Sequence, residues 1–269
     1  GVTTDGASLL TFPRSYNAAH DLLARNTCRA GKAAFIDTAS GRQMTYGELE
    51  QQAHRFANAL RAQGFAPESR VLMAMLDTPD WPVVFLGCIL AGVVPVAANT
   101  LLTTPDFEFM LRDSRAQGLV VSSALLPAFE PLFGKAGALK TVIVSGADNS
   151  VSPSGSSLLL TDLIAAQPAT PSIADTCADD ACLWLYSSGS TGTPKGTVHL
   201  HSHLIQTAEL YGRGVLGIKE TDVVYSAAKL FFAYGLGNAL TFPMSVGATT
   251  LLLPARPTPA DVFGILKKY

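Results

Sequence analysis

The strongest chemical signal in the 269-residue sequence lies at residues 186–196, which read Tyr-Ser-Ser-Gly-Ser-Thr-Gly-Thr-Pro-Lys-Gly. This run contains three glycines, three serines, two threonines and one lysine. Glycine lets backbone N–H groups come close to an anion, hydroxyl groups add hydrogen-bond donors, and lysine adds a full positive charge. The combination predicts a loop that binds a polyphosphate. A plain surface turn also favours glycine, serine and threonine, but it does not require so many of them before Pro-Lys-Gly.

Two well-known loops of similar composition do not fit this run. A P-loop has Gly-Lys-Ser/Thr with four residues between its glycines, whereas here Pro194 precedes Lys195 and Gly196 follows it. A hydrolase nucleophile elbow has Gly-x-Ser-x-Gly, whereas Ser190 directly follows Gly189. The run therefore predicts a different kind of phosphate loop.

Residues 187–196 resemble the phosphate loop of the acyl-adenylate-forming superfamily, Ser/Thr-Ser-Gly-Ser/Thr-Thr-Gly-x-Pro-Lys-Gly, and match it at every specified position. Residues 90–99, Leu-Ala-Gly-Val-Val-Pro-Val-Ala-Ala-Asn, are similar to an early core motif of that family, and residues 45–49 to its N-terminal helix start. The resemblance covers nearly all of the chain. It implies catalytic roles for Lys195 and Thr191. It also implies that the ATP phosphates are bound by Ser187, Ser188, Gly189, Ser190, Thr191, Gly192, Thr193 and Lys195.

A second segment, Ala227-Ala-Lys-Leu-Phe-Phe-Ala-Tyr-Gly-Leu-Gly-Asn238, offers a flat apolar wall with one hydroxyl, which suits an aromatic ring. An ordinary core segment is the alternative interpretation. The segment resembles the acid-pocket motif of the aryl-CoA ligase branch, in its benzoate–CoA ligase form. That resemblance implies substrate contacts from Phe232, Ala233, Tyr234 and Gly235; the more general family pattern has a histidine where this chain has Phe232.

The resemblance implies ATP-dependent ligation of benzoate, or a close aryl acid, to coenzyme A through an acyl-AMP, with Mg²⁺ accompanying ATP. The sequence does not determine the oligomeric state, and a homodimer is one alternative. Residues 196–269 contain none of the family's later motifs. These motifs are aromatic-Gly-x-Thr-Glu, Thr-Gly-Asp and a lysine on a C-terminal domain. We therefore expect an inactive N-terminal portion of a longer enzyme. Ligases for hydroxy-, amino- or halobenzoate, and a non-catalytic nucleotide- or acid-binding fragment, stay open as alternatives.

Two weaker patterns give no site. His199, His201 and His203 alternate and would share one face of a strand, as the ligands of a metal ion can, but the strand is expected to end near His201. The family resemblance accounts for His201 and leaves His203 where an asparagine is common. The Gly212–Gly217 run fits Gly-x-Gly-x-x-Gly but follows a helix rather than a strand, which argues against a dinucleotide fingerprint. We assign no metal ligand.

Alternating helix and strand patterns must position these segments. Thr45 and Glu48 form a capping box before Leu49, Ala53, Phe56, Ala57 and Leu60, which recur at helical spacing. Further helices are predicted at 79–91, from a Thr104 cap and a first-turn Pro105 to Ser114, near 124–133 and from a Ser202 cap. Strands are predicted at 70–76, 93–97, 118–121, 140–144, 181–186 and 196–201. Continuous apolar strands between helices predict mostly parallel sheets covered on both faces.

The expected fold class is α/β, with layered αβα subdomains that form the N-terminal part of the acyl-adenylate-forming fold. Serine- and proline-rich stretches at 145–157 and 167–180 suggest a subdomain boundary. We expect residues 1–178 to form a subdomain with the first sheet. Residues 179–269 are then part of a second one that carries both the phosphate loop and the acid-pocket segment.

Composition excludes several protein classes. Only 15% of the residues are charged, against about 25% in typical domains, which argues against disorder. A net charge of −2 argues against binding to nucleic acid or to an anionic membrane surface. Charge-free runs at 81–105 and 230–255 contain glycine and proline, so each predicts a buried helix and strand rather than a membrane span. Four scattered cysteines without a secretory signal predict a cytoplasmic protein with reduced thiols.

Overall fold

The computed structural model describes residues 3–4, 10–146, 157–187 and 194–269, and its larger sheet has the strand order β11-β10-β6-β5-β7-β8-β9. All neighbours in this sheet run parallel except β10 and β11. The strands are β5 (Arg70–Ala74), β6 (Val94–Ala97), β7 (Gly118–Ser122), β8 (Thr141–Ser145), β9 (Leu158–Leu159), β10 (Ala181–Ser187) and β11 (Lys195–Leu200). The predicted layered α/β fold with mostly parallel sheets is confirmed.

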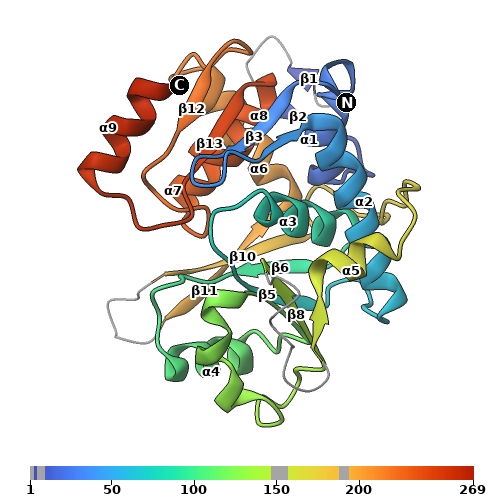
Figure 1. Ribbon diagram of the computed structural model, residues 1–269. Helices are drawn as coiled ribbons and strands as arrows, with labels where there is room; N and C mark the ends of the chain where they lie inside the picture. The colour runs from blue at the N-terminus through green and yellow to red at the C-terminus, as the bar shows by residue number, and fades with distance from the viewer. Residues whose placement is uncertain (1–2, 5–9, 147–156, 188–193) are drawn as a thin grey trace.

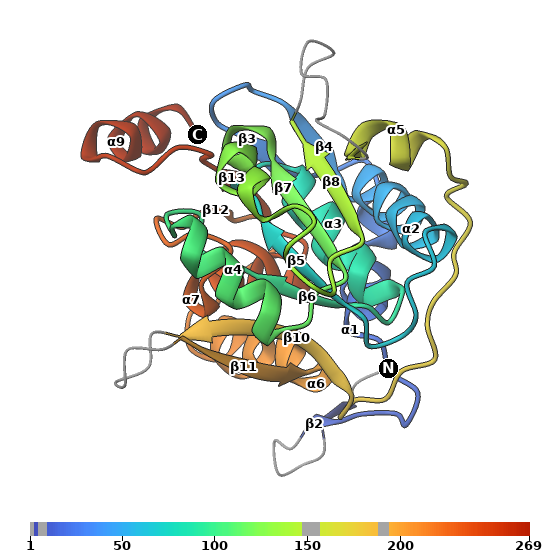
Figure 2. The same ribbon diagram turned by 90° about the horizontal axis from the view of Figure 1, so that it is seen from below.

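Both faces of the inner strands β5, β6 and β7 of the larger sheet are buried. Along β5, Leu72 and Ala74 pack in the cluster that contains Phe107 of α4 (Thr104–Asp113), while Val71 and Met73 pack in the main cluster on the other face. Figure 2 shows α4 on one side of the strands and α2 (Tyr46–Ala62) and α3 (Asp80–Leu90) on the other. Period-2 alternation sends successive apolar residues to opposite faces, which is why the strand sequences are continuously apolar.

A smaller sheet has the order β12-β13-β3-β4 and lies beyond α2 and α3 (Figure 1). Its strands are β3 (Ala33–Asp37), β4 (Gln43–Thr45), β12 (Val223–Tyr225) and β13 (Thr249–Leu252). The two sheets do not divide the chain at residue 178, because β3 comes before this residue and pairs with β13, while β10 comes after it and pairs with β6. The subdomain division at this position stays a prediction.

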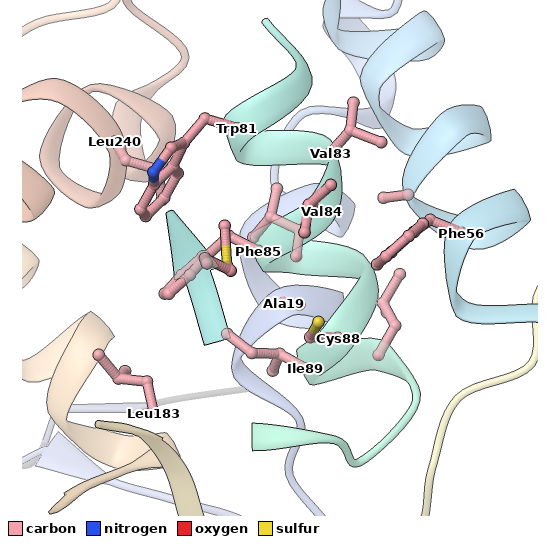
Figure 3. Close-up of a cluster of buried hydrophobic side chains, with 14 of the residues drawn as sticks. Ala19, Phe56, Trp81, Val83, Val84, Phe85, Cys88, Ile89, Leu183 and Leu240 are labelled. Atoms are coloured by element: carbon pink, nitrogen blue, oxygen red, sulfur yellow. The ribbon is translucent and has the colours of Figure 1, made fainter. Parts of the chain in front are cut away.

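The helices between the two sheets contribute to the larger of the two buried clusters. The capping box of Thr45 and Glu48 starts α2, as predicted, and the residues at helical spacing are buried. Figure 3 shows Phe56 of α2 pointing toward α3, and Trp81 of α3 lying beside Leu240. The helices approach closely at Gly87, where a Cβ would lie 2.8 Å from the carbonyl oxygen of Ala53. Glycine is therefore required at this crossing.

Four local predictions are corrected. Residues 124–133 form two 3₁₀ segments, η2 (Ser123–Ala128) and η3 (Glu130–Leu132), because Pro127 and Pro131 lack the N–H that an α-helix needs. The cap of α4 is Thr103 rather than Thr104. β11 ends at Leu200 instead of His201. Ser202 lies inside α6 (His201–Thr207), where the backbone N–H of Leu200 donates to His203 Nδ1.

The charge-free runs break into separate elements, as expected. The first forms α3 and β6, and the second forms α7 (Ala233–Leu236), the π-helix η5 (Gly237–Thr241), α8 (Phe242–Val246) and β13. Among the described residues, no helix has the length and apolar character needed to cross a membrane. The remaining elements are β1 (Thr3–Thr4), β2 (Leu10–Thr11), α1 (Ala18–Ala24), η1 (Thr27–Arg29), α5 (Leu160–Ala165), the π-helix η4 (Ala208–Arg213) and α9 (Pro259–Lys268).

Candidate active site

The base of the predicted phosphate loop is an antiparallel strand pair. Ser187 ends β10, Lys195 begins β11, and the two residues are cross-strand partners with exposed side chains. The other predicted phosphate-binding residues, Ser188, Gly189, Ser190, Thr191, Gly192 and Thr193, lie outside the described residues. The strand pair therefore places Ser187 and Lys195 side by side at the same end of the sheet.

Aromatic side chains hold this base in place. Tyr186 pairs with Gly196, where a Cβ would lie 3.2 Å from Trp184 Cε3 and 3.4 Å from Tyr186 Cζ, so that only glycine leaves the two rings undisturbed. The Tyr186 hydroxyl donates to Asp113 Oδ2 at 2.6 Å, which ties β10 to the end of α4. Burial, followed by this hydrogen bond, raises the pKa of Tyr186 above its ordinary value. The tyrosine therefore stays a neutral donor.

The acid-pocket segment meets the loop base at the carboxyl ends of β6 and β10. A cavity of about 140 Å³ lies there, and its lining includes Ser187 and Pro194 from the loop base, Asn99 after β6, and Phe231 and Phe232. Parallel strands present their carboxyl ends at one edge, which is where open α/β sheets bind ligands. The structure thus brings together two segments that the sequence singled out separately.

Within the acid-pocket segment, residues 229–232 form a tight turn that leads into α7. The Phe232 N–H donates to the carbonyl oxygen of Lys229 at 3.0 Å, and the Leu236 N–H donates to that of Phe232 at 2.8 Å. A Cβ on Gly235 would lie only 2.0 Å from the Lys229 carbonyl oxygen. Gly235 is buried by this close approach, whereas Phe232 and Tyr234 keep 48% and 68% of their surface exposed.

Three consecutive side chains of this segment open onto three cavities. Phe232 lines the 140 Å³ cavity beside the loop base. Ala233 lines one of about 130 Å³ together with His199 and His203, and Tyr234 lines one of about 320 Å³ together with Tyr225 and Asn238. The predicted residues Phe232, Ala233 and Tyr234 are therefore all accessible to a small molecule, and Gly235 shapes the turn that presents them.

The three alternating histidines do not share a face. His199 and His203 lie edge to face, with ring centroids 5.7 Å apart. His201 is buried and accepts a hydrogen bond from the Ala18 N–H on Nδ1 at 3.1 Å. Burial lowers the pKa of His201 to about 4, so this imidazole is neutral near pH 7 and joins α6 to α1. The end of β11 at Leu200 explains why the strand alternation does not extend to His203.

Sequence reasoning missed a charged pair between the buried Asp77 and Lys229, a partly buried residue of the acid-pocket segment. Asp77 follows β5, and its Oδ2 lies 3.9 Å from Lys229 Nζ. Burial raises the pKa of Asp77 to about 6, although Lys229 and the Leu230 N–H favour its charged form. The detectable signal is a lone acidic residue directly after an apolar strand, at the edge where parallel strands end.

A comparison with known proteins finds that residues 23–269 match the family model described as AMP-binding enzyme. The chain is 52% identical to benzoate–CoA ligase of Thauera aromatica over 97% of its own length and 48% of that protein. It is 44% identical to the 4-hydroxybenzoate–CoA/benzoate–CoA ligase of Rhodopseudomonas palustris over 95% of its own length and 46% of that protein. The chain thus spans about half the length of these curated relatives.

Solved structures show the same relationship. A benzoate CoA ligase from Burkholderia xenovorans superposes with a TM-score of 0.85 at 48% identity, covering 94% of this chain and 48% of the other. The anthranilate CoA ligase AuaEII, solved with anthranoyl-AMP, superposes with a TM-score of 0.88 at 36% identity, with the same coverage. Both similarities extend over nearly all of the present chain.

Proposed function

Because this chain belongs to the AMP-binding enzyme family, we propose that the enzyme containing it joins benzoate, or a close aryl acid, to coenzyme A. The observation that carries the proposal is the cavity lined jointly by Ser187 and Pro194 of the loop base and by Phe231 and Phe232 of the acid-pocket segment. A nucleotide phosphate and an aromatic acid would meet there. The names of the two closely similar relatives, which cover benzoate and 4-hydroxybenzoate, support the class of acid.

The proposed reaction has two steps, because a carboxylate repels a thiolate and is a poor electrophile. In the first, a carboxylate oxygen attacks the α-phosphorus of ATP, forming acyl-AMP and releasing pyrophosphate. In the second, the sulfur of coenzyme A attacks the acyl carbon, the thiol proton is lost to solvent, and AMP leaves with its electron pair. The products are benzoyl-CoA, AMP and pyrophosphate.

This chain would supply the groups that hold the reactants of the first step. Negative charge gathers around the phosphates, so Lys195 and the hydroxyls and N–H groups of the loop, Thr191 among them, would stabilise it electrostatically. Mg²⁺ bound with ATP would neutralise further phosphate charge, and we assign no residue of this chain to it. Phe232, Ala233 and Tyr234 would provide the contacts to the aromatic acid, and Gly235 would shape the turn that presents them.

The direct test is an assay of the purified enzyme with ATP, coenzyme A and a panel of acids: benzoate, hydroxy-, amino- and halobenzoates, and a straight-chain fatty acid. We expect AMP to form with benzoate or a ring-substituted benzoate in equal amount to the aryl-CoA product. AMP formation only with the fatty acid would contradict the aromatic pocket. Binding of acid and nucleotide without any AMP would support the non-catalytic alternative.

Replacing Lys195 by alanine is expected to lower kcat/KM for ATP by about 10- to 100-fold, because an exposed positive charge aimed at the phosphates is lost. Benzoate-dependent release of pyrophosphate at varied ATP concentration measures this effect. Lys140→Ala is the matched control: it removes the same charge from an exposed site before β8, at the opposite end of the parallel strands. Equal kinetics for both variants would remove Lys195 from the site.

Replacing Tyr234 by alanine is expected to raise the KM for benzoate by about 2- to 13-fold, because an aromatic contact is worth about 0.5–1.5 kcal/mol. The KM for ATP should stay within about twofold. Tyr234→Phe separates the two parts of the side chain: it keeps the ring and removes the hydroxyl. An alanine variant with an unaltered acid profile would exclude Tyr234 from the pocket.

A further inference from the structure

An ion pair between the buried Asp77 and the partly buried Lys229, which belongs to the acid-pocket segment, joins the two sheets. Lys229 Nζ lies 3.9 Å from Asp77 Oδ2, and it donates to the carbonyl oxygens of Leu253 and, at 2.7 Å, of Ala255. Asp77 follows β5 of the larger sheet, whereas Leu253 and Ala255 follow β13 of the smaller one. One ammonium group therefore contacts the strand ends of both sheets.

The same carboxylate also contacts the backbone of the segment. The Leu230 N–H donates to Asp77, at 3.3 Å from Oδ2 and 3.4 Å from Oδ1, and Leu230 is completely buried. The Asp77 side chain keeps only 6% of its surface exposed. A buried carboxylate with one cation and one N–H partner resists displacement, because moving any partner leaves a buried charge uncompensated.

The position of Lys229 determines the positions of the substrate-facing residues. Its carbonyl oxygen accepts the Phe232 N–H and touches Gly235 so closely that no Cβ would fit between them. A displacement of Lys229 must therefore move Phe232 and Gly235 with it. Phe232 lines the cavity that it shares with Ser187 and Pro194. The position of Phe232 in that cavity therefore depends, through the backbone, on the position of the ion pair.

We propose that Asp77 and Lys229 are positioning residues that hold the acid-pocket segment at its working distance from the phosphate loop. The proposal rests on the proposed function, and it adds two residues that do not themselves contact the acid. Their contacts described above run to the segment and to the end of β13, so loss of the pair should affect use of the acid far more than use of ATP. Misplacement of a bound reactant by about 1 Å can cost about 100-fold in rate.

The first experiment measures position without activity, by hydrogen exchange of backbone amides. Asp77→Asn keeps the size of the side chain and an oxygen for the Leu230 N–H but removes the charge. We expect exchange in peptides covering residues 229–236 to become at least about tenfold faster, with β7 unchanged. Glu209→Gln is the matched control, since it instead breaks the ion pairs of Glu209 on η4 with Arg25, which follows α1 (2.9 Å), and with Arg213 (3.0 Å). Unchanged exchange over residues 229–236 in Asp77→Asn would overturn the inference, whatever the enzyme does with benzoate.

The second experiment separates positioning from general stability. In Asp77→Asn and in Lys229→Met, the KM for benzoate should rise about tenfold while the KM for ATP stays within about twofold. The double variant should recover part of the loss, because neither charge is then left buried alone. Equal increases of both KM values would show that the pair only stabilises the fold. An unchanged KM for benzoate in a destabilised variant would show the same. If the wild-type enzyme makes no AMP from any aryl acid, the proposed function fails, and the exchange result alone decides this inference.

Discussion

Replacing Gly235 by alanine is expected to lower kcat/KM for benzoate by at least about 100-fold. A Cβ at this position would lie 2.0 Å from the Lys229 carbonyl oxygen, 2.5 Å from its carbonyl carbon and 2.6 Å from the Ala228 carbonyl oxygen. All three are backbone atoms and cannot rotate away, so the turn must open. Opening it displaces Phe232 from the cavity that it shares with the loop base.

Gly264→Ala is the matched control for Gly235→Ala. It makes the same substitution in a helix, α9, where the new Cβ would meet no atom within 4 Å. Alanine should be neutral or stabilising at that position by up to about 1 kcal/mol, because it is the better helix former. Steady-state kinetics with benzoate varied, together with the thermal midpoint of each variant, make the comparison. A Gly235→Ala enzyme with normal kcat/KM would show that the turn does not shape the acid site.

Replacing Trp81 by alanine is expected to lower the free energy of unfolding by about 3–5 kcal/mol. Trp81 is completely buried, stacks on Phe85 with ring centroids 4.9 Å apart, and lies beside Leu240 in the interior (Figure 3). Its indole Nε1 has no hydrogen-bond partner among the described residues. The loss would therefore come from the cavity and from lost apolar burial, not from a broken hydrogen bond.

Urea unfolding of the purified protein, followed by fluorescence and by circular dichroism, measures this change. Val215→Ala is the control, because Val215 is 71% exposed and its truncation should alter stability by less than about 0.5 kcal/mol. The expected result is a large fall in the urea midpoint for Trp81→Ala alone. Similar midpoints for the two variants would mean that the interior closes around the deleted ring.

The sequence predicted those elements whose signals are local. The capping box of Thr45 and Glu48 starts α2 as expected, and the strand predicted at 70–76 appears as β5. The smaller sheet was missed as a unit, because β3 is short and its partner β13 is far along the chain. The helix predicted near 124–133 is instead two 3₁₀ segments that contain Pro127 and Pro131. Both prolines are visible in the sequence, but the prediction gave more weight to the apolar pattern around them.

The same limit applies to the candidate site. The motifs predicted Phe232, Ala233, Tyr234 and Gly235, and of these Phe232 lines the cavity beside the base of the predicted loop, while Ala233 and Tyr234 line two other cavities. Asp77 and Lys229 could not be paired from the sequence, because the Asp77 carboxylate reaches a backbone N–H 153 residues away. His201 was singled out by its spacing, yet its imidazole accepts a hydrogen bond from the N-terminus of α1. Long-range partners of this kind follow from the fold and not from spacing.

The pairing of β3 with β13 has a consequence for synthesis on the ribosome. The Thr38 hydroxyl, at the end of β3, donates to the carbonyl oxygen of Leu252, which is 214 residues further along the chain. At about 5–20 residues per second, β3 and β4 emerge about 10–40 s before the strand that completes their sheet. During that interval the edge of β3 offers unpaired N–H and C=O groups to any other nascent chain. The antiparallel partner β4 covers only one side of β3, so the growing chain depends on the later arrival of β13 to close the other.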